Sequence, residues 1–70
     1  MHKYEIVIYW SPEDDAFVAE VPELPGCQAH GDSQAAALEN CQEAIDLWIE
    51  TAREMGRDVP KAKGGRLRLA

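Results

Sequence analysis

The chain contains 70 residues, has a formal net charge of −6 at pH 7 and is 46% hydrophobic. A chain of this length buries only about 60% of the surface that its unfolded form exposes, so its core is small. We therefore expect a single domain, 1–70, that gains stability by self-association as a homodimer or larger homo-oligomer. No apolar run approaches the ~20 residues that span a bilayer, and residues 1–10 lack the pattern of a secretory signal. We expect a cytoplasmic protein with no membrane contact.

Charge is divided unevenly along the chain. Residues 1–50 contain eleven acidic side chains against Lys3 alone, a formal −10, whereas residues 51–70 have a formal charge of +4. An acidic body repels a phosphate backbone and steers a basic protein partner toward it. The alternative interpretation is a solvated surface that only keeps the protein soluble.

The two cysteines predict packing rather than chemistry. Cys27 falls in a strand pattern and Cys41 in a helix pattern, which indicates two buried thiols in a reducing compartment. Together with His2 and His30 they form no CxxC, HxxxH or HExxH spacing. We therefore expect no metal site and no cofactor, and a strand-end role for His30 rather than a catalytic one.

The first part of the chain predicts a β-hairpin. Residues 3–10 are rich in β-branched and aromatic side chains and alternate in polarity, as a strand does. The side expected to face the helix consists of Tyr4, Ile6, Ile8 and Trp10, and the partly apolar outer side, with Val7 and Tyr9, indicates a subunit contact. Residues 11–15 predict a turn with Pro12 at its first central position. Residues 16–21 predict the second strand, with Phe17, Ala19 and Val21 buried and Glu20 outward.

The stretch 20–33 joins strand patterns to a helix pattern. Pro22 and Pro25 cannot occupy a central strand, and Gly26 supplies the backbone freedom that a tight reversal needs. Residues 27–30 then predict a short third strand. Gly31 ends that strand, and Asp32 or Ser33 provides the cap of a following helix.

A long helix is predicted over 34–55. Its apolar stripe has steps of three and four residues and consists of Ala35, Leu38, Cys41, Ile45, Trp48, Ala52 and Met55. Ala37, Ala44, Leu47 and Ile49 widen this stripe. Gly56 supplies the stop, and Pro60 prevents continuation.

These elements define an α+β fold of two layers, a three-stranded antiparallel sheet followed by one long helix and a short C-terminal strand (β-β-β-α-β). We expect a core over 3–56, a connector over 57–65 and an edge strand over 66–69. The edge strand either returns to its own sheet or crosses to a neighbouring subunit, and the alternative is a frayed terminus. No separate DNA-binding domain is expected.

The order of turn, cap and helix residues resembles a known family. The residues that carry the resemblance are the run from Phe17 to Cys27, then Gly31, Asp32 and Ser33, then Ala36, Leu38, Glu39 and Asn40, then Glu43, Ala44 and Ile45. This pattern is similar to the HicB antitoxins of HicBA toxin–antitoxin pairs over about 4–60. The resemblance implies part of an RNase H-like fold and a protein-binding, non-catalytic role. The implied partner is a HicA-type toxin, a small basic mRNA interferase whose active surface is covered by the antitoxin.

Candidate contact residues follow from charge and position. The predicted partner-binding residues are Glu13, Asp14, Asp15, Glu20 and Glu23. The compact basic tail predicts weak, salt-sensitive nucleic-acid contact through Lys61, Lys63, Arg66 and Arg68. Full-length relatives often carry a DNA-binding segment after this domain, and we expect none here, so specific DNA binding is not predicted.

Two alternative functions stay open from the residues alone. One is an orphan oligomeric module with an unknown protein or small-ligand partner. The other is a degenerate RNase H-like nuclease, which needs three or four carboxylates that converge on metal ions. The available carboxylates lie on a turn, a strand, a cap and a helix, so we expect no catalytic residue and no enzyme.

Overall fold

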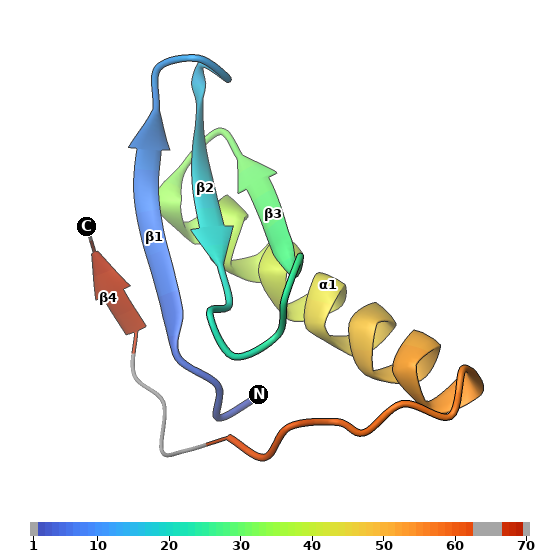
Figure 1. Cartoon of the computed structure of the whole chain (residues 1–70). Coiled ribbons are helices and arrows are strands. Elements are labelled where there is room, and N and C mark those ends of the chain that lie inside the picture. The colour runs from blue at the N-terminus through green and yellow to red at the C-terminus, as the bar shows by residue number, and fades with distance from the viewer. Residues whose placement is uncertain (1, 63–66, 70) are drawn as a thin grey trace.

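The computed structural model describes residues 2–62 and 67–69. The elements are β1 (Ile6–Ser11), β2 (Ala16–Glu20), β3 (Gln28–Gly31), α1 (Gln34–Glu54) and β4 (Leu67–Leu69) (Figure 1). The expected α+β arrangement is confirmed, because three antiparallel strands precede one long helix. The expected strand 3–10 begins three residues too early.

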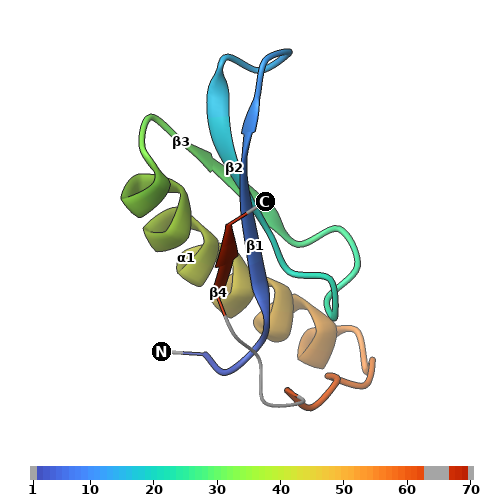
Figure 2. The same cartoon turned by 90° about the vertical axis from the view of Figure 1, so that its left-hand side faces the viewer.

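The sheet has the strand order β3-β2-β1-β4, and the helix covers one of its faces (Figure 2). β1 and β2 are antiparallel, as are β2 and β3, whereas β4 runs parallel to β1. The short C-terminal strand therefore returns to its own sheet, and Arg66, its expected first residue, lies outside the described residues. The Tyr4 hydroxyl donates a hydrogen bond to the carbonyl of Pro60, which holds the connector against the start of the chain.

The hairpin alternation is confirmed for most of its inner face. The register pairs Ile8 with Ala19 and Trp10 with Phe17, and Ile8 and Ala19 are buried. The expected burial of Trp10 is wrong, since it is 47% exposed, with its ring packed edge-to-face on the half-buried Phe17 at a centroid distance of 5.1 Å. The physical reason is that the hairpin extends beyond the start of the helix (Figure 1), so nothing within the described residues covers its tip.

The loop between β2 and β3 is packed rather than open. Leu24 in its middle is fully buried beside Val21 and Cys27. Three backbone bonds close the loop: Val21 N donates to the Cys27 carbonyl at 3.0 Å, Leu24 N to the Val21 carbonyl at 3.1 Å, and Cys27 N to the Leu24 carbonyl at 2.9 Å. Gly26 has φ +80, the left-handed conformation that glycine adopts without strain.

The two ends of α1 follow the predicted signals. Ser33 rather than Asp32 is the cap, with its Oγ accepting from Ala36 N at 3.0 Å, and Gly56 has φ +70 just after the helix. At the start, β3 and α1 nearly touch, because a Cβ added to Gly31 would meet Ala37 N at 2.3 Å. Only glycine permits this close approach.

The helix buries a narrower face than the predicted stripe. Ala37, Cys41, Ile45 and Ala52 are buried, and Leu38 and Trp48 are half-buried. The expected burial is wrong for Ala35, which is exposed, for Leu47, which is 64% exposed, and for Met55, which is 61% exposed. Met55 lies beyond the sheet, where α1 extends past the strands (Figure 1).

Candidate partner-binding site

The hairpin turn presents three carboxylates to solvent. Glu13, Asp14 and Asp15 are all exposed. Ser11 pins the turn, since its Oγ donates to Asp14 Oδ2 at 2.9 Å and lies 3.4 Å from Asp14 N, which donates to it. Asp15 has φ +50, a left-handed conformation that aspartate tolerates better than most residues. These hydrogen bonds hold the turn in a conformation that presents its carboxylates to solvent.

His30 extends this acidic turn toward the third strand. Its Nε2 lies 3.4 Å from Asp14 Oδ2, and both side chains are about half exposed. The contact becomes an ion pair only when the imidazole is protonated. His30 therefore lies near the end of β3, beside a carboxylate. This position agrees with the strand-end location that the sequence predicts.

Glu20 lies on the outer face of the sheet, the face opposite α1. The Tyr9 hydroxyl donates to Glu20 Oε1 at 2.8 Å across the β1–β2 pair. This hydrogen bond, followed by burial and by the negative charges of Glu20 and Asp14, raises the pKa of Tyr9 above its usual value. Val18, which is paired with Tyr9 in the register, also faces away from the helix and is only 2% exposed. The outer face is therefore partly apolar, as the strand pattern predicts.

Glu23 has a structural contact. It is half-buried in the β2–β3 loop, and its Oε1 accepts from the backbone N of Glu5 at 3.3 Å. This bond connects the loop to the segment before β1. Of the five predicted contact residues, Glu23 accepts from a backbone N–H of another segment, so its substitution is expected to affect the fold.

The five predicted carboxylates do not form one cluster. The turn residues lie at one end of β2, and Glu20 and Glu23 lie at its other end (Figure 1). A strand of five residues spans roughly 16 Å at ~3.3 Å per residue, so the two groups are separated by about that length. A partner that contacts all five must therefore cover the whole length of β2.

The predicted basic tail is only partly described. Lys61 is exposed at the end of the connector. Lys63 and Arg66 lie outside the described residues, and Arg68 is placed only by its backbone register opposite Val7. The predicted nucleic-acid contact of these four residues stays a prediction.

Metal ligands do not converge anywhere in residues 2–62 and 67–69, where no group of three or more His, Cys, Asp or Glu side chains could hold an ion. Cys27 and Cys41 are buried free thiols. Burial raises the pKa of Cys41 to about 11, with a smaller contribution from Cys27, whose own pKa burial also raises. Such thiols are poor nucleophiles at neutral pH.

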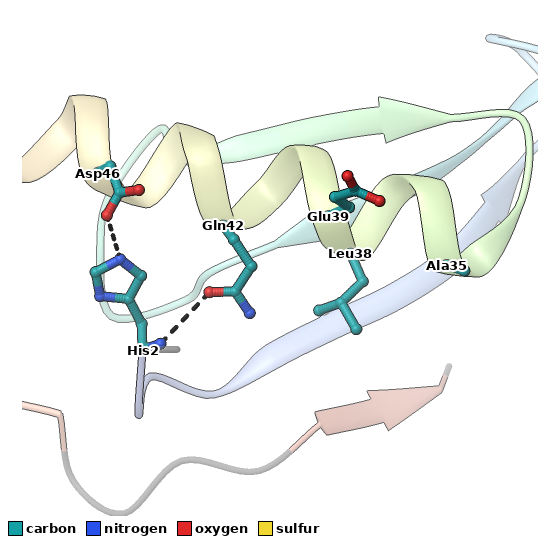
Figure 3. Close-up of a pocket in the computed structure, with 6 residues that line it drawn as sticks. All are labelled: His2, Ala35, Leu38, Glu39, Gln42 and Asp46. Atoms are coloured by element: carbon teal, nitrogen blue, oxygen red, sulfur yellow. Dashed lines mark hydrogen bonds and ion pairs between the residues drawn. The ribbon is translucent and has the colours of Figure 1, made fainter.

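One hollow was missed by the sequence patterns, and we call it the helix groove. It has a volume of about 540 Å³ and is lined by His2, Ala35, Leu38, Glu39, Gln42 and Asp46 (Figure 3). His2 comes from the start of the chain, more than thirty residues before the other five, so no local pattern reveals the groove. The sequence contains one sign of this groove: Glu39 and Asp46 are seven residues apart and therefore lie on one face of the helix, where both are exposed.

These features define a two-layer α+β domain with an acidic surface and a partly apolar outer sheet face. A family model described as the HicB-like antitoxin of bacterial toxin–antitoxin systems matches residues 4–65. The chain belongs to this HicB-like antitoxin family. The resemblance drawn from the turn, cap and helix residues is thereby confirmed.

Individual relatives agree with this membership. The chain is 44% identical over 57 residues to a UPF0150 protein of Synechocystis, a match that covers 81% of this chain and 77% of the relative. It is 37% identical over 59 residues to a UPF0150 protein of Thermoplasma acidophilum, which covers 84% of each chain. An uncharacterized protein of Haemophilus phage HP1 is 39% identical over 49 residues, 70% of this chain and 37% of that protein. No solved structure matches the chain.

No helix within the described residues is both long and apolar enough to cross a membrane.

Proposed function

We propose that this protein neutralises a HicA-type mRNA interferase by binding it and covering its active surface. The family supports an antitoxin role in general, and an antitoxin implies a toxin partner. The observation that supports a basic partner is the charge of residues 1–50, a formal −10, with seven of the eleven acidic side chains exposed on the hairpin turn and α1. The role is binding in the cytoplasm rather than catalysis.

The proposed mechanism has two stages. The acidic surface first attracts the basic toxin, which raises the association rate in a salt-dependent way. The partly apolar surface around Val7 and Tyr9, both half-buried, then excludes water from the contact. A stable interface of standard size covers about 800 Å² on each partner, which requires more than the turn alone. The contact therefore includes the outer sheet face.

The experiment is co-expression of the tagged chain with the small open reading frame beside its gene, followed by pull-down and a growth assay. We expect recovery of a basic partner that arrests growth alone and is harmless in the complex. A catalytically inactive variant of that partner, with its active-site histidine replaced, serves as the control for toxicity. A clean pull-down with no partner and no rescue of growth would contradict the proposal and favour an orphan oligomeric module.

We also propose that the protein forms a homodimer or larger oligomer. Trp10 supports this, because its ring is 47% exposed at the hairpin tip and tryptophan is enriched in protein interfaces. Sedimentation equilibrium of the purified chain should give at least twice the 7.8 kDa monomer mass, and Trp10→Ala should shift it toward the monomer. A monomeric mass for the wild-type chain at high concentration would contradict self-association.

A further inference from the structure

The helix groove lies along the side of α1 that faces the start of the chain (Figure 3). Leu38 and Gln42 are half-buried in it, whereas Ala35, Glu39 and Asp46 are exposed. Within the described residues, α1 packs on β3, β2 and β1 but not on β4. The sheet is therefore wider than the helix that covers it, and the groove runs along the helix on this less covered side.

The groove has an apolar floor and an acidic rim. Ala35 and Leu38 supply apolar surface, and the carboxylates of Glu39 and Asp46 stand seven residues apart, two turns along the same helix face. Asp46 is in contact with His2, whose Nε2 lies 2.6 Å from the Asp46 Oδ1. Glu39 forms no ion pair with any described residue. The rim thus retains negative charge that a cationic side chain would compensate.

Repulsion between carboxylates along α1 also favours a cationic partner. Glu39 and Glu43 are four residues apart, as are Asp46 and Glu50, and all four are exposed. Like charges at this spacing destabilise a helix. The helix contains no lysine, and its one arginine, Arg53, lies in the last turn. A basic partner on this side of the helix would relieve that repulsion, whereas a nucleic acid would increase it.

Gln42 adds a hydrogen-bond donor without an acceptor. Its Oε1 accepts from the backbone N of His2 at 3.4 Å, but its Nε2 is buried and has no hydrogen-bond partner. A buried amide nitrogen without an acceptor is unfavourable. Since the bond to His2 is long, the side chain can turn toward the groove at little cost, where a backbone carbonyl of a bound segment would accept from it.

We propose that the helix groove binds an extended basic segment of the protein partner. An apolar side chain of that segment packs on Ala35 and Leu38, a lysine or arginine pairs with Glu39 within the field of Asp46, and a backbone carbonyl accepts from Gln42. This inference rests on the proposed function for the identity of the partner, and on the groove itself for the chemistry. The groove is a contact surface separate from the carboxylates of the hairpin turn, of β2 and of the β2–β3 loop.

The first test uses a short peptide of leucine, lysine and serine and follows the amide signals of the protein by NMR. We expect shifts at Ala35, Leu38 and Gln42 with the lysine peptide and none with a matched peptide that has glutamate in place of lysine. Shifts confined to the hairpin turn, or equal shifts with both peptides, would overturn the groove proposal.

The second test uses charge reversal in the full complex. Glu39→Lys with Asp46→Lys should weaken the complex with the co-expressed toxin at least about tenfold at ~0.15 M salt. Glu54→Lys with Asp58→Lys is the matched control, because both are exposed carboxylates that neither line the groove nor lie within four residues of Glu39 or Asp46. The control pair should change affinity by no more than about threefold. Equal losses of affinity for both pairs would show that only the net charge of the protein matters, and would overturn the proposal.

Gln42→Met separates a binding role from a structural one. Methionine is similar in length and removes the unpaired donor, so the unfolding midpoint should stay the same or rise. The affinity for the lysine peptide should nevertheless fall several-fold. A rise in stability with unchanged peptide affinity would show that Gln42 does not contact the segment.

The two proposals fail in different ways. A recovered toxin whose affinity is unchanged by reversal at positions 39 and 46 would leave the antitoxin function intact and remove the groove from its interface. Peptide binding in the groove without any recovered toxin would leave the groove intact and remove the proposed function.

Discussion

The two connections of the antiparallel sheet look alike in sequence but differ in structure. Both contain proline and acidic residues, yet the β1–β2 turn is exposed throughout, whereas the β2–β3 loop buries Leu24 completely and closes on itself with three backbone bonds. Trp48 fastens the loop further, since its Nε1 donates to the Pro25 carbonyl at 2.9 Å. The loop is therefore part of the core, and the turn is a surface available to a partner.

The largest expected effect is in the packed loop. Leu24→Ala removes a fully buried side chain and leaves a cavity, so it should lower the free energy of unfolding by ~2–5 kcal/mol. Denaturant melts measure the loss. Glu13→Ala in the exposed turn is the matched change and should stay within about 0.5 kcal/mol. Similar losses for the two variants would contradict the division into core loop and surface turn.

Alkaline pH should weaken the core beneath the same loop. Burial raises the pKa of Cys41 from 9.0 to about 11, so the unfolded chain loses this proton first as the pH rises. Stability that is present below about pH 9 should decline between pH 9 and 11, by a total on the order of 2 kcal/mol. Melts at several pH values measure this slope.

The control for the pH effect is Cys41→Ala. This variant should be less stable at neutral pH because it opens a cavity, but its alkaline slope should be shallower than that of the wild type. An unchanged slope would assign the alkaline loss to other groups, of which Tyr9 is one, since its pKa is also raised.

A smaller effect is expected for the indole contact of the loop. Trp48→Phe removes the bond to the Pro25 carbonyl and should cost about 1 kcal/mol. Trp10→Phe makes the same chemical change at the exposed hairpin tip and should cost less than about 0.5 kcal/mol at protein concentrations where the chain is monomeric. A loss at position 10 that grows with protein concentration would support the proposed contact of the hairpin tip in an oligomer.

The smallest expected difference separates two of the predicted contact residues. Glu23→Lys breaks the bond to the backbone N of Glu5 and should lower stability by roughly 0.5–1.5 kcal/mol. Glu13→Lys should leave the melt unchanged within about 0.5 kcal/mol but slow association with the toxin, more so at low salt. Stopped-flow association and melts distinguish the two. A slower association for Glu23→Lys alone would place the interface at the loop instead of the turn.

Local chemistry explains which parts of the fold are predictable. Alternation identifies the hairpin, and Ser33, Gly26 and Gly56 mark a cap and two left-handed positions, because each of these signals acts over a few residues. The exposure of Trp10 and Met55 depends instead on how far the helix and the hairpin extend past each other. Nothing within a single element's sequence fixes that offset.

The site is less predictable than the fold for the same reason. Charge identifies the acidic residues, but not the ~16 Å that separates Asp15 from Glu20 or the backbone contact of Glu23. The helix groove joins His2 to Asp46 across 44 residues, and such a contact exists only after folding. The buried Leu24 likewise has no periodic signal, since it lies between two prolines.

The most direct measurement of the central claim is RNA cleavage by the purified toxin in the presence of increasing amounts of this protein. If the protein is an antitoxin that acts by covering the active surface, cleavage should fall in proportion to added protein and stop at a fixed molar ratio. Undiminished cleavage at a large excess of this protein, with a complex visible by gel filtration, would show binding without occlusion and contradict the proposed mechanism.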